Sequence, residues 1–93
     1  MIDKDELYEK AYRKWGAEAQ IGMLFEEIGE LMVAINKNRR LVNGCDTDKV
    51  IDEIADVEIM LEQFCYMGMI TREAIDKRKR QKLKRLEKLL SQS

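Results

Sequence analysis

Two short acidic patterns contain the residues whose types and spacing could do chemistry in this 93-residue chain. The first is Glu26-Glu27-Ile28-Gly29-Glu30-Leu31, and the second, 26 residues later, is Asp52-Glu53-Ile54-Ala55-Asp56-Val57. Both consist of an acid, Glu, Ile, a small residue, an acid and an aliphatic residue. Each pattern therefore carries two carboxylates three residues apart, which lie on the same side of a helix.

Apolar residues around these patterns recur at helical spacing, and they predict which side of each helix is buried. The predicted stripes are Leu24, Ile28, Leu31 and Ile35 in one helix and Val50, Ile54, Val57, Leu61, Phe64 and Gly68 in the other. At about 100° per residue, Glu27 and Glu53 lie roughly 70° from the centre of their stripes, and Glu30 and Asp56 roughly 130°. Antiparallel packing through the stripes would bring the four carboxylates into one cleft.

Four carboxylates in one cleft favour a bound cation. At separations of about 4–6 Å, each close pair repels by roughly 1–4 kcal/mol, depending on the effective dielectric constant. Oxygen ligands favour Mg²⁺ or Mn²⁺ over zinc, and the absence of histidine excludes a Glu-x-x-His di-iron site. The alternative is a solvated surface, because single acidic pairs at this spacing arise by chance. Duplication of the pair at matching angles argues for the metal site.

The composition predicts a single all-α domain, an antiparallel bundle of about four helices. The chain has no proline, and its apolar residues are mostly helix formers. The helices are expected over about residues 3–16, 17–40, 47–68 and 71–91, with a turn at 43–46. Asp3 with Glu6 is expected to cap the first helix, and Gly16 to end it. Thr47 or Asp48 opens the third helix, and Thr71 the fourth.

The second predicted helix is apolar on nearly every side, which indicates that protein surrounds it. Gly22 and Gly29 lie on one face of it, where another helix could approach closely. A chain of this length is too short to enclose such a helix alone. We therefore expect self-association into a homodimer or homotetramer.

Charge is distributed unevenly between the two ends of the chain. Residues 1–70 hold 15 acidic and 8 basic residues, whereas residues 71–93 hold 3 and 9. Lys79 and Lys82 fall within the apolar stripe of the last helix, where lysine stems could simply cover apolar surface. Alternatively, Lys82 and Arg85 could face the acidic cleft and bind phosphates. Nucleic-acid binding is disfavoured, because the rest of the chain is acidic and this helix lacks aromatic residues for stacking.

Neither a membrane span nor a signal peptide is expected. The longest apolar run, Leu31 to Ile35, is far shorter than the roughly 20 residues that cross a bilayer. Cys45 and Cys65 match no metal-binding spacing or disulfide framework. Reduced thiols and a cytoplasmic location are the expectation.

Taken together, these residues resemble the MazG-like branch of the all-α nucleoside triphosphate pyrophosphohydrolases over about residues 12–88. That family carries Glu-x-x-Glu and then Glu-x-x-Asp on successive helices, matched here by residues 27–30 and 53–56. Trp15-Gly16 and Gln20 resemble the family's entry to its first acidic helix. Lys82-Leu83-x-Arg85-Leu86 resembles its C-terminal basic motif.

The resemblance implies one MazG-like domain over residues 1–93 that hydrolyses a nucleoside triphosphate to a nucleoside monophosphate and pyrophosphate, cleansing the nucleotide pool. Mg²⁺, or Mn²⁺, would be the cofactor. The implied metal ligands are Glu27, Glu30, Glu53 and Asp56, with Glu27 also expected to act as general base. Lys82 and Arg85 would bind phosphates, and Trp15 and Gln20 would contact the base. The alternative is a non-catalytic helical module that binds a nucleotide or a protein partner.

Overall fold

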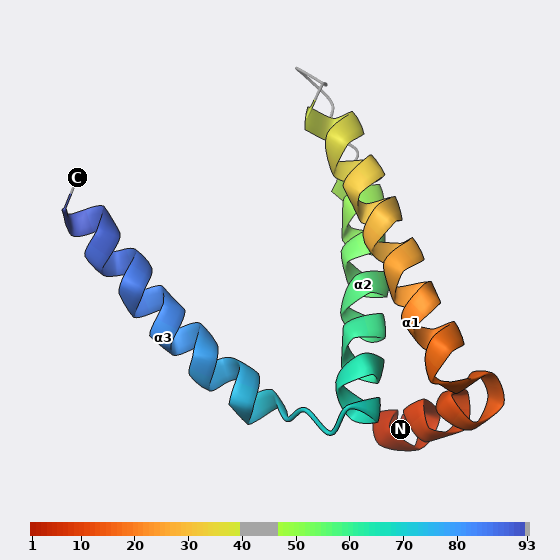
Figure 1. The fold of residues 1–93 in the computed structure, drawn as a ribbon. Coiled ribbons are helices and arrows are strands. Elements are labelled where there is room, and N and C mark those ends of the chain that lie inside the picture. Colours follow the sequence, from red (N-terminus) through yellow and green to blue (C-terminus); the bar gives the residue numbers. More distant parts are fainter. Residues whose placement is uncertain (40–46, 93) are drawn as a thin grey trace.

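The computed structural model describes residues 1–39 and 47–92, which form three α-helices and no strand (Figure 1). The helices are α1 (Lys4–Arg39), α2 (Thr47–Met67) and α3 (Arg72–Ser91). Helices α1 and α2 lie side by side and antiparallel, whereas α3 leaves the end of α2 and points away from the pair (Figure 1). The all-α prediction is confirmed. Within the described ranges, no helix combines the length and apolar character needed to cross a bilayer.

A sharp bend at Gly16 divides α1 into two differently oriented parts (Figure 1). The backbone there is non-helical, with φ 82° and ψ 164°, although helix continues on both sides. The predicted helix end at Gly16 is therefore confirmed as a break in the helical backbone, and α1 contains two helical segments joined at this kink. Residues 4–15 form what we call the N-terminal arm.

Local capping explains where the helices begin. The backbone N–H of Glu6 donates to Oδ1 of Asp3 at 3.2 Å. Likewise, the Ala74 N–H donates to Oγ1 of Thr71 at 3.1 Å, so Thr71 caps α3 as predicted. Helix α2 begins at Thr47 and ends one residue before Gly68, also as predicted. The predicted helix end at Arg40 and the turn at 43–46 lie outside the described residues.

Polar contacts hold the N-terminal arm against the end of α2. Nζ of Lys4 lies 2.9 Å from Oε1 of Glu62, and the Tyr8 hydroxyl donates to the same oxygen at 3.0 Å. One turn further along α2, the Tyr66 hydroxyl donates to Oε2 of Glu9 at 2.6 Å. These contacts hold the N-terminal arm, which precedes the Gly16 kink, against the C-terminal part of α2.

The buried apolar residues lie between α1 and α2. They are Leu24 and Ala34 from α1 and Val57 and Met60 from α2. The predicted apolar stripe of α2 is therefore only partly correct: Val57 is buried, but Ile54 and Leu61 remain 42% and 43% exposed. Compared with the prediction, α2 is rotated about its axis. Glu53 consequently faces α1 instead of flanking the contact.

The expected close approach of another helix at the two helical glycines does not occur within the described chain. A Cβ atom placed at Gly22 or Gly29 would meet no atom within 4 Å. On α1, both positions lie roughly opposite the residues that face α2. Any helix that approaches them would have to come from outside the described part of the chain.

Candidate metal centre

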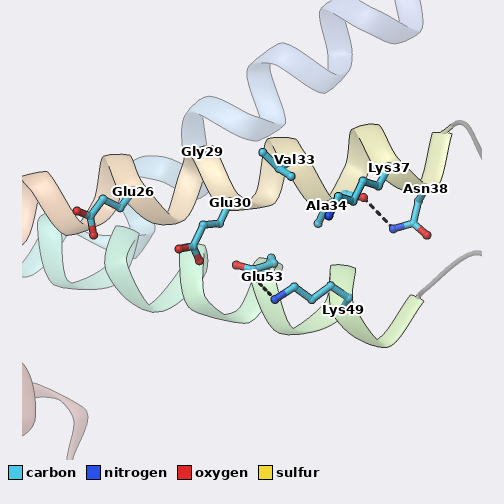
Figure 2. A pocket seen from close by; sticks show the side chains of 9 residues that line it. All are labelled: Glu26, Gly29, Glu30, Val33, Ala34, Lys37, Asn38, Lys49 and Glu53. Carbon is cyan, nitrogen blue, oxygen red and sulfur yellow. Dashed lines mark hydrogen bonds and ion pairs between the residues drawn. The ribbon is translucent and has the colours of Figure 1, made fainter.

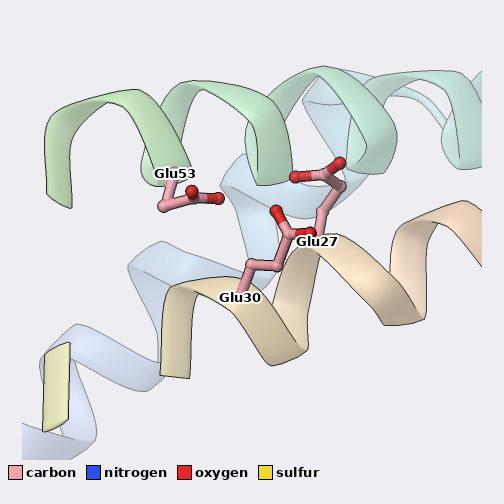
Figure 3. A group of neighbouring side chains, drawn as sticks. All are labelled: Glu27, Glu30 and Glu53. Atoms are coloured by element: carbon pink, nitrogen blue, oxygen red, sulfur yellow. The ribbon is translucent and has the colours of Figure 1, made fainter. Parts of the chain in front are cut away.

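Three carboxylates from the two acidic motifs come together where α1 and α2 face each other (Figure 3). Glu27 and Glu30, three residues apart, project from the same side of α1. Glu53 projects toward them from α2. One carboxylate oxygen from each residue lies within 4.8 Å of the other two. The structure thus places three of the four predicted ligands in one group.

Asp56 lies outside this group and is exposed on α2. Since α2 turns Glu53 directly toward α1, a residue three positions later lies about 60° around the helix, on the solvent side. Asp56 is nevertheless near enough for its charge to act on Glu27. It therefore belongs to the electrostatic surroundings of the group.

Burial leaves two of these carboxylates with unsatisfied oxygen atoms. Glu53 is 3% exposed; its Oε1 accepts a charged hydrogen bond from Lys49, with Nζ at 2.8 Å, while its Oε2 is buried without a hydrogen-bond partner. Oε2 of Glu27 is also buried and unpartnered. Unpaired buried acceptors are costly, and each one requires an explanation. A cation between the two helices would provide one.

Burial and neighbouring negative charges raise the pKa of Glu27 above its usual value. Burial contributes most, followed by the charges of Glu30, Asp56 and Glu53. The ionised form is disfavoured because it is removed from water and repelled by other acids. A divalent cation would reverse both effects.

A cleft of about 970 Å³ adjoins the carboxylates (Figure 2). Glu26 and Glu30 lie toward one end, Lys37 and Asn38 toward the other, and the Lys49–Glu53 ion pair lies between them. The cleft can therefore accept a ligand that has a cation-bound part and a separate anionic part. Sequence analysis missed these basic residues. The four-residue spacing of Lys49 and Glu53, which places them on adjacent helical turns, could have revealed their pairing.

The predicted phosphate-binding residues lie elsewhere in this structure. Lys82 and Arg85 are exposed on α3 and do not line this cleft. In the described part of the chain, α3 packs against neither α1 nor α2. The single chain therefore does not bring the basic motif to the carboxylates.

The two predicted base-contacting residues differ in accessibility. Trp15 adjoins the Gly16 kink and is 52% exposed, with Nζ of Lys14 5.3 Å from its ring centroid. Gln20 is 2% exposed, and its Nε2 donates to the carbonyl oxygen of Ala11 at 3.4 Å, across the kink. Trp15 is thus available to a ligand, whereas Gln20 supports the bend in α1.

The donor set fits a hard divalent cation. All ligand atoms are carboxylate oxygens, two of the carboxylates have a buried oxygen without a partner, and each of the two helices contributes. Mg²⁺ and Mn²⁺ favour such oxygen donors.

Comparisons with protein-family models, curated proteins and solved structures gave no match for this chain.

Proposed function

We propose that the chain is a Mg²⁺-dependent nucleoside triphosphate pyrophosphohydrolase of the MazG-like type, with Mn²⁺ as a possible substitute metal. The observation that carries the proposal is the group formed by Glu27, Glu30 and Glu53, in which two buried carboxylate oxygens have no partner. The duplicated acidic motif and its resemblance to this family support the choice of reaction.

Glu27, Glu30 and Glu53 would hold the metal, and we propose Asp56 as a fourth ligand. When bound, the ion would neutralise negative charge on the phosphates and on the departing pyrophosphate. A water oxygen would attack the α-phosphorus while the bond between that atom and the bridging oxygen of pyrophosphate breaks. Glu27 would accept the proton of the water through a carboxylate oxygen that does not bind the metal. The products are a nucleoside monophosphate and pyrophosphate.

Several basic residues are candidates for binding the phosphates. Lys37 and Lys49 line the cleft beside the acidic group. Lys82 and Arg85 remain the candidates that the family motif implies, and they would reach the cleft from another copy or after a movement of α3. Trp15, being exposed, would stack on the base, and Gln20 would contact it after its surroundings opened.

We further propose that the protein acts as a homo-oligomer in the cytoplasm and cleanses the nucleotide pool. Many large apolar side chains are exposed on all three helices, which supports self-association. A reduced thiol at Cys65 would suit the cytoplasm, a reducing compartment. Cys45 lies outside the described residues.

Product analysis tests the proposed reaction. The protein is incubated with canonical and modified nucleoside triphosphates and Mg²⁺ or Mn²⁺, and the products are separated by anion exchange. We expect monophosphate and pyrophosphate. Glu30→Gln should abolish turnover, whereas Glu26→Gln should retain it, because both residues line the cleft but only Glu30 belongs to the acidic group. The absence of products across the full panel would refute the proposal.

A non-catalytic module that binds a nucleotide or a protein partner is the second candidate. It is favoured by the position of Lys82 and Arg85 away from the cleft. Calorimetry distinguishes the two functions, because a module would bind nucleotide without releasing product during prolonged incubation.

A further inference from the structure

Lys49 supplies a positive charge to the acidic group from within the chain. Its Nζ lies 2.8 Å from Oε1 of Glu53, which is one helical turn further along α2 (Figure 2). The charge of Glu30 also acts on this ammonium group. Lys49 therefore serves as a counter-ion for the clustered carboxylates.

The two partners of this ion pair differ in their freedom to move. The Glu53 side chain is 4% exposed and faces α1, whereas the Lys49 side chain is 59% exposed. A lysine ammonium group lies at the end of a flexible four-carbon stem and can turn toward different partners. Lys49 can therefore leave Glu53 without disturbing the contact between α1 and α2, whereas Glu53 cannot follow it.

A bound divalent ion would displace Lys49 from this carboxylate. Oε2 of Glu53 is buried without a hydrogen-bond partner, and Glu53 belongs to one group with Glu27 and Glu30. An ion on Oε2 and an ammonium group on Oε1 would share one carboxylate, where two positive charges repel each other. Because the ion has the larger charge and gains further carboxylate ligands, Lys49 is the cation that leaves.

The cleft beside Glu53 offers the displaced ammonium group a destination. Lys49 lies one turn before Glu53 on α2, and in an antiparallel pair this direction leads toward the later residues of α1. Those residues include Lys37 and Asn38, which line the same cleft as Lys49 (Figure 2). A movement of its stem alone would place Lys49 near Lys37, at the end of the cleft away from Glu27. Two lysines there favour an anion such as a polyphosphate.

We propose that Lys49 is exchanged between Glu53 and a phosphate group. It neutralises Glu53 in the metal-free protein, and it binds a phosphate oxygen when a metal-bound polyphosphate enters the cleft. The inference rests on the proposed function for the class of ligand, and it adds that Lys49 selects the form in which the ligand binds. A lone metal ion meets the Lys49 ammonium group, and a lone polyphosphate meets carboxylates and a lysine that is already paired. Only the complex suits both.

The exchange couples the binding of the metal to the binding of the anion. A metal that frees Lys49 improves the affinity for phosphate, and by thermodynamic linkage the phosphate improves the affinity for the metal by the same factor. A purely structural ion pair on a helix surface would contribute little to either affinity. The two roles of Lys49 can therefore be distinguished by binding measurements.

Calorimetric titration of inorganic pyrophosphate into the full chain, in a chelator, tests the exchange without metal or turnover. Glu53→Gln removes the charge that holds Lys49, so pyrophosphate should bind at least about tenfold more tightly than to wild type. Glu30→Gln is the matched control and should gain less, because it removes the same charge from the same group but not the hydrogen-bond partner of Lys49. In the Lys49→Met background, Glu53→Gln should gain no more than Glu30→Gln does.

A second set of titrations compares the free ion with its complex. Lys49→Met should bind Mn²⁺ alone more tightly than wild type, but it should bind the Mn²⁺ complex of pyrophosphate at least about fivefold more weakly. Opposite signs are expected because Lys49 repels the ion and attracts the anion. Lys37→Met, in the same cleft, is the control and should weaken binding of the complex while changing the affinity for free Mn²⁺ little.

Three results would overturn the exchange in the chelator experiment: equal gains in Glu53→Gln and Glu30→Gln, a Glu53→Gln gain that persists in the Lys49→Met background, or no pyrophosphate binding by Glu53→Gln. A Lys49→Met protein whose affinities for Mn²⁺ and for the complex change in the same direction would also overturn it. Should Glu53→Gln fail to fold by circular dichroism, the Lys49→Met titrations decide alone. An inactive wild type would refute the proposed reaction and leave the chelator result standing.

Discussion

The ammonium nitrogen of Lys49 lies 2.8 Å from Oε1 of Glu53, whose side chain is 4% exposed. The ammonium group of Lys49 thus partly neutralises Glu53, the most buried of the three clustered carboxylates. The other oxygen of Glu53 is buried without a hydrogen-bond partner and remains available to a metal. Lys49 therefore stabilises the metal-free protein while opposing a second cation nearby.

Replacing this lysine separates those two effects. Lys49→Met should raise the affinity for Mn²⁺ by roughly tenfold, because a positive charge that repels the ion is removed. The metal-free protein should lose about 1–3 kcal/mol of stability, because a buried acceptor of Glu53 loses its partner. Calorimetric titration and urea unfolding measure the two changes. Lys37→Met, in the same cleft, is the matched control and should alter stability little. An unchanged or weaker Mn²⁺ affinity in Lys49→Met would show that the ion binds elsewhere.

Glu27→Gln should stabilise the metal-free protein at neutral pH. The folded-state pKa of Glu27 is raised, so its ionised form costs stability above that pKa. As pH falls through the raised value, the wild-type carboxyl becomes neutral in the fold and the cost disappears. The advantage of the variant should therefore shrink toward pH 4, near the unfolded pKa of about 4.3. Urea unfolding in a chelator at pH 7 and pH 4 measures it; a variant less stable than wild type at pH 7 would refute the electrostatic explanation.

Tyr66→Phe should loosen the N-terminal arm. The Tyr66 hydroxyl, and then the guanidinium of Arg13, lower the pKa of Glu9, so the ionised carboxylate stabilises the fold. That stability is present above the unfolded pKa and is lost as pH falls through the lower folded value. The variant should be modestly less stable at pH 7, and the difference should fade below about pH 4. Thermal unfolding followed by circular dichroism tests this. Tyr12→Phe should change nothing, because no hydrogen bond of the Tyr12 hydroxyl occurs within the described residues.

Gly16→Ala should destabilise the protein by about 1–3 kcal/mol, because its φ and ψ lie in a region that is nearly exclusive to glycine. Gly22→Ala is the matched control: it should stabilise by up to about 1 kcal/mol, because Gly22 is helical. Neither added Cβ would meet an atom within 4 Å, so the contrast isolates the backbone. Denaturant unfolding measures both. Equal effects at the two positions would indicate that the kink is not retained in solution.

The helix boundaries could be predicted because they depend on local chemistry, as the Thr71 cap and the glycine at position 16 show. The convergence of Glu27, Glu30 and Glu53 also followed from matched spacing on antiparallel helices. The rotation of α2 did not, since Ile54 and Leu61 form an apolar stripe beside the one that packs. Periodicity alone could not choose between the two.

The position of α3 is even harder to predict from nearby residues in the sequence. Helix α3 follows a short connection after Gly68, its leucines are exposed, and within the described residues it packs on neither α1 nor α2. For this reason, the sequence could identify Lys82 and Arg85 as basic residues of interest without indicating what they face.

Calorimetric titration of Mn²⁺ into the nucleotide-free protein tests most directly whether the acidic group holds a divalent cation. Wild type and Glu26→Gln should bind the ion with similar affinity, whereas Glu30→Gln should bind it at least roughly tenfold more weakly, since it removes a ligand. Equal affinity in Glu30→Gln and wild type, or no binding by wild type at millimolar Mn²⁺, would show that the three carboxylates are not a metal centre.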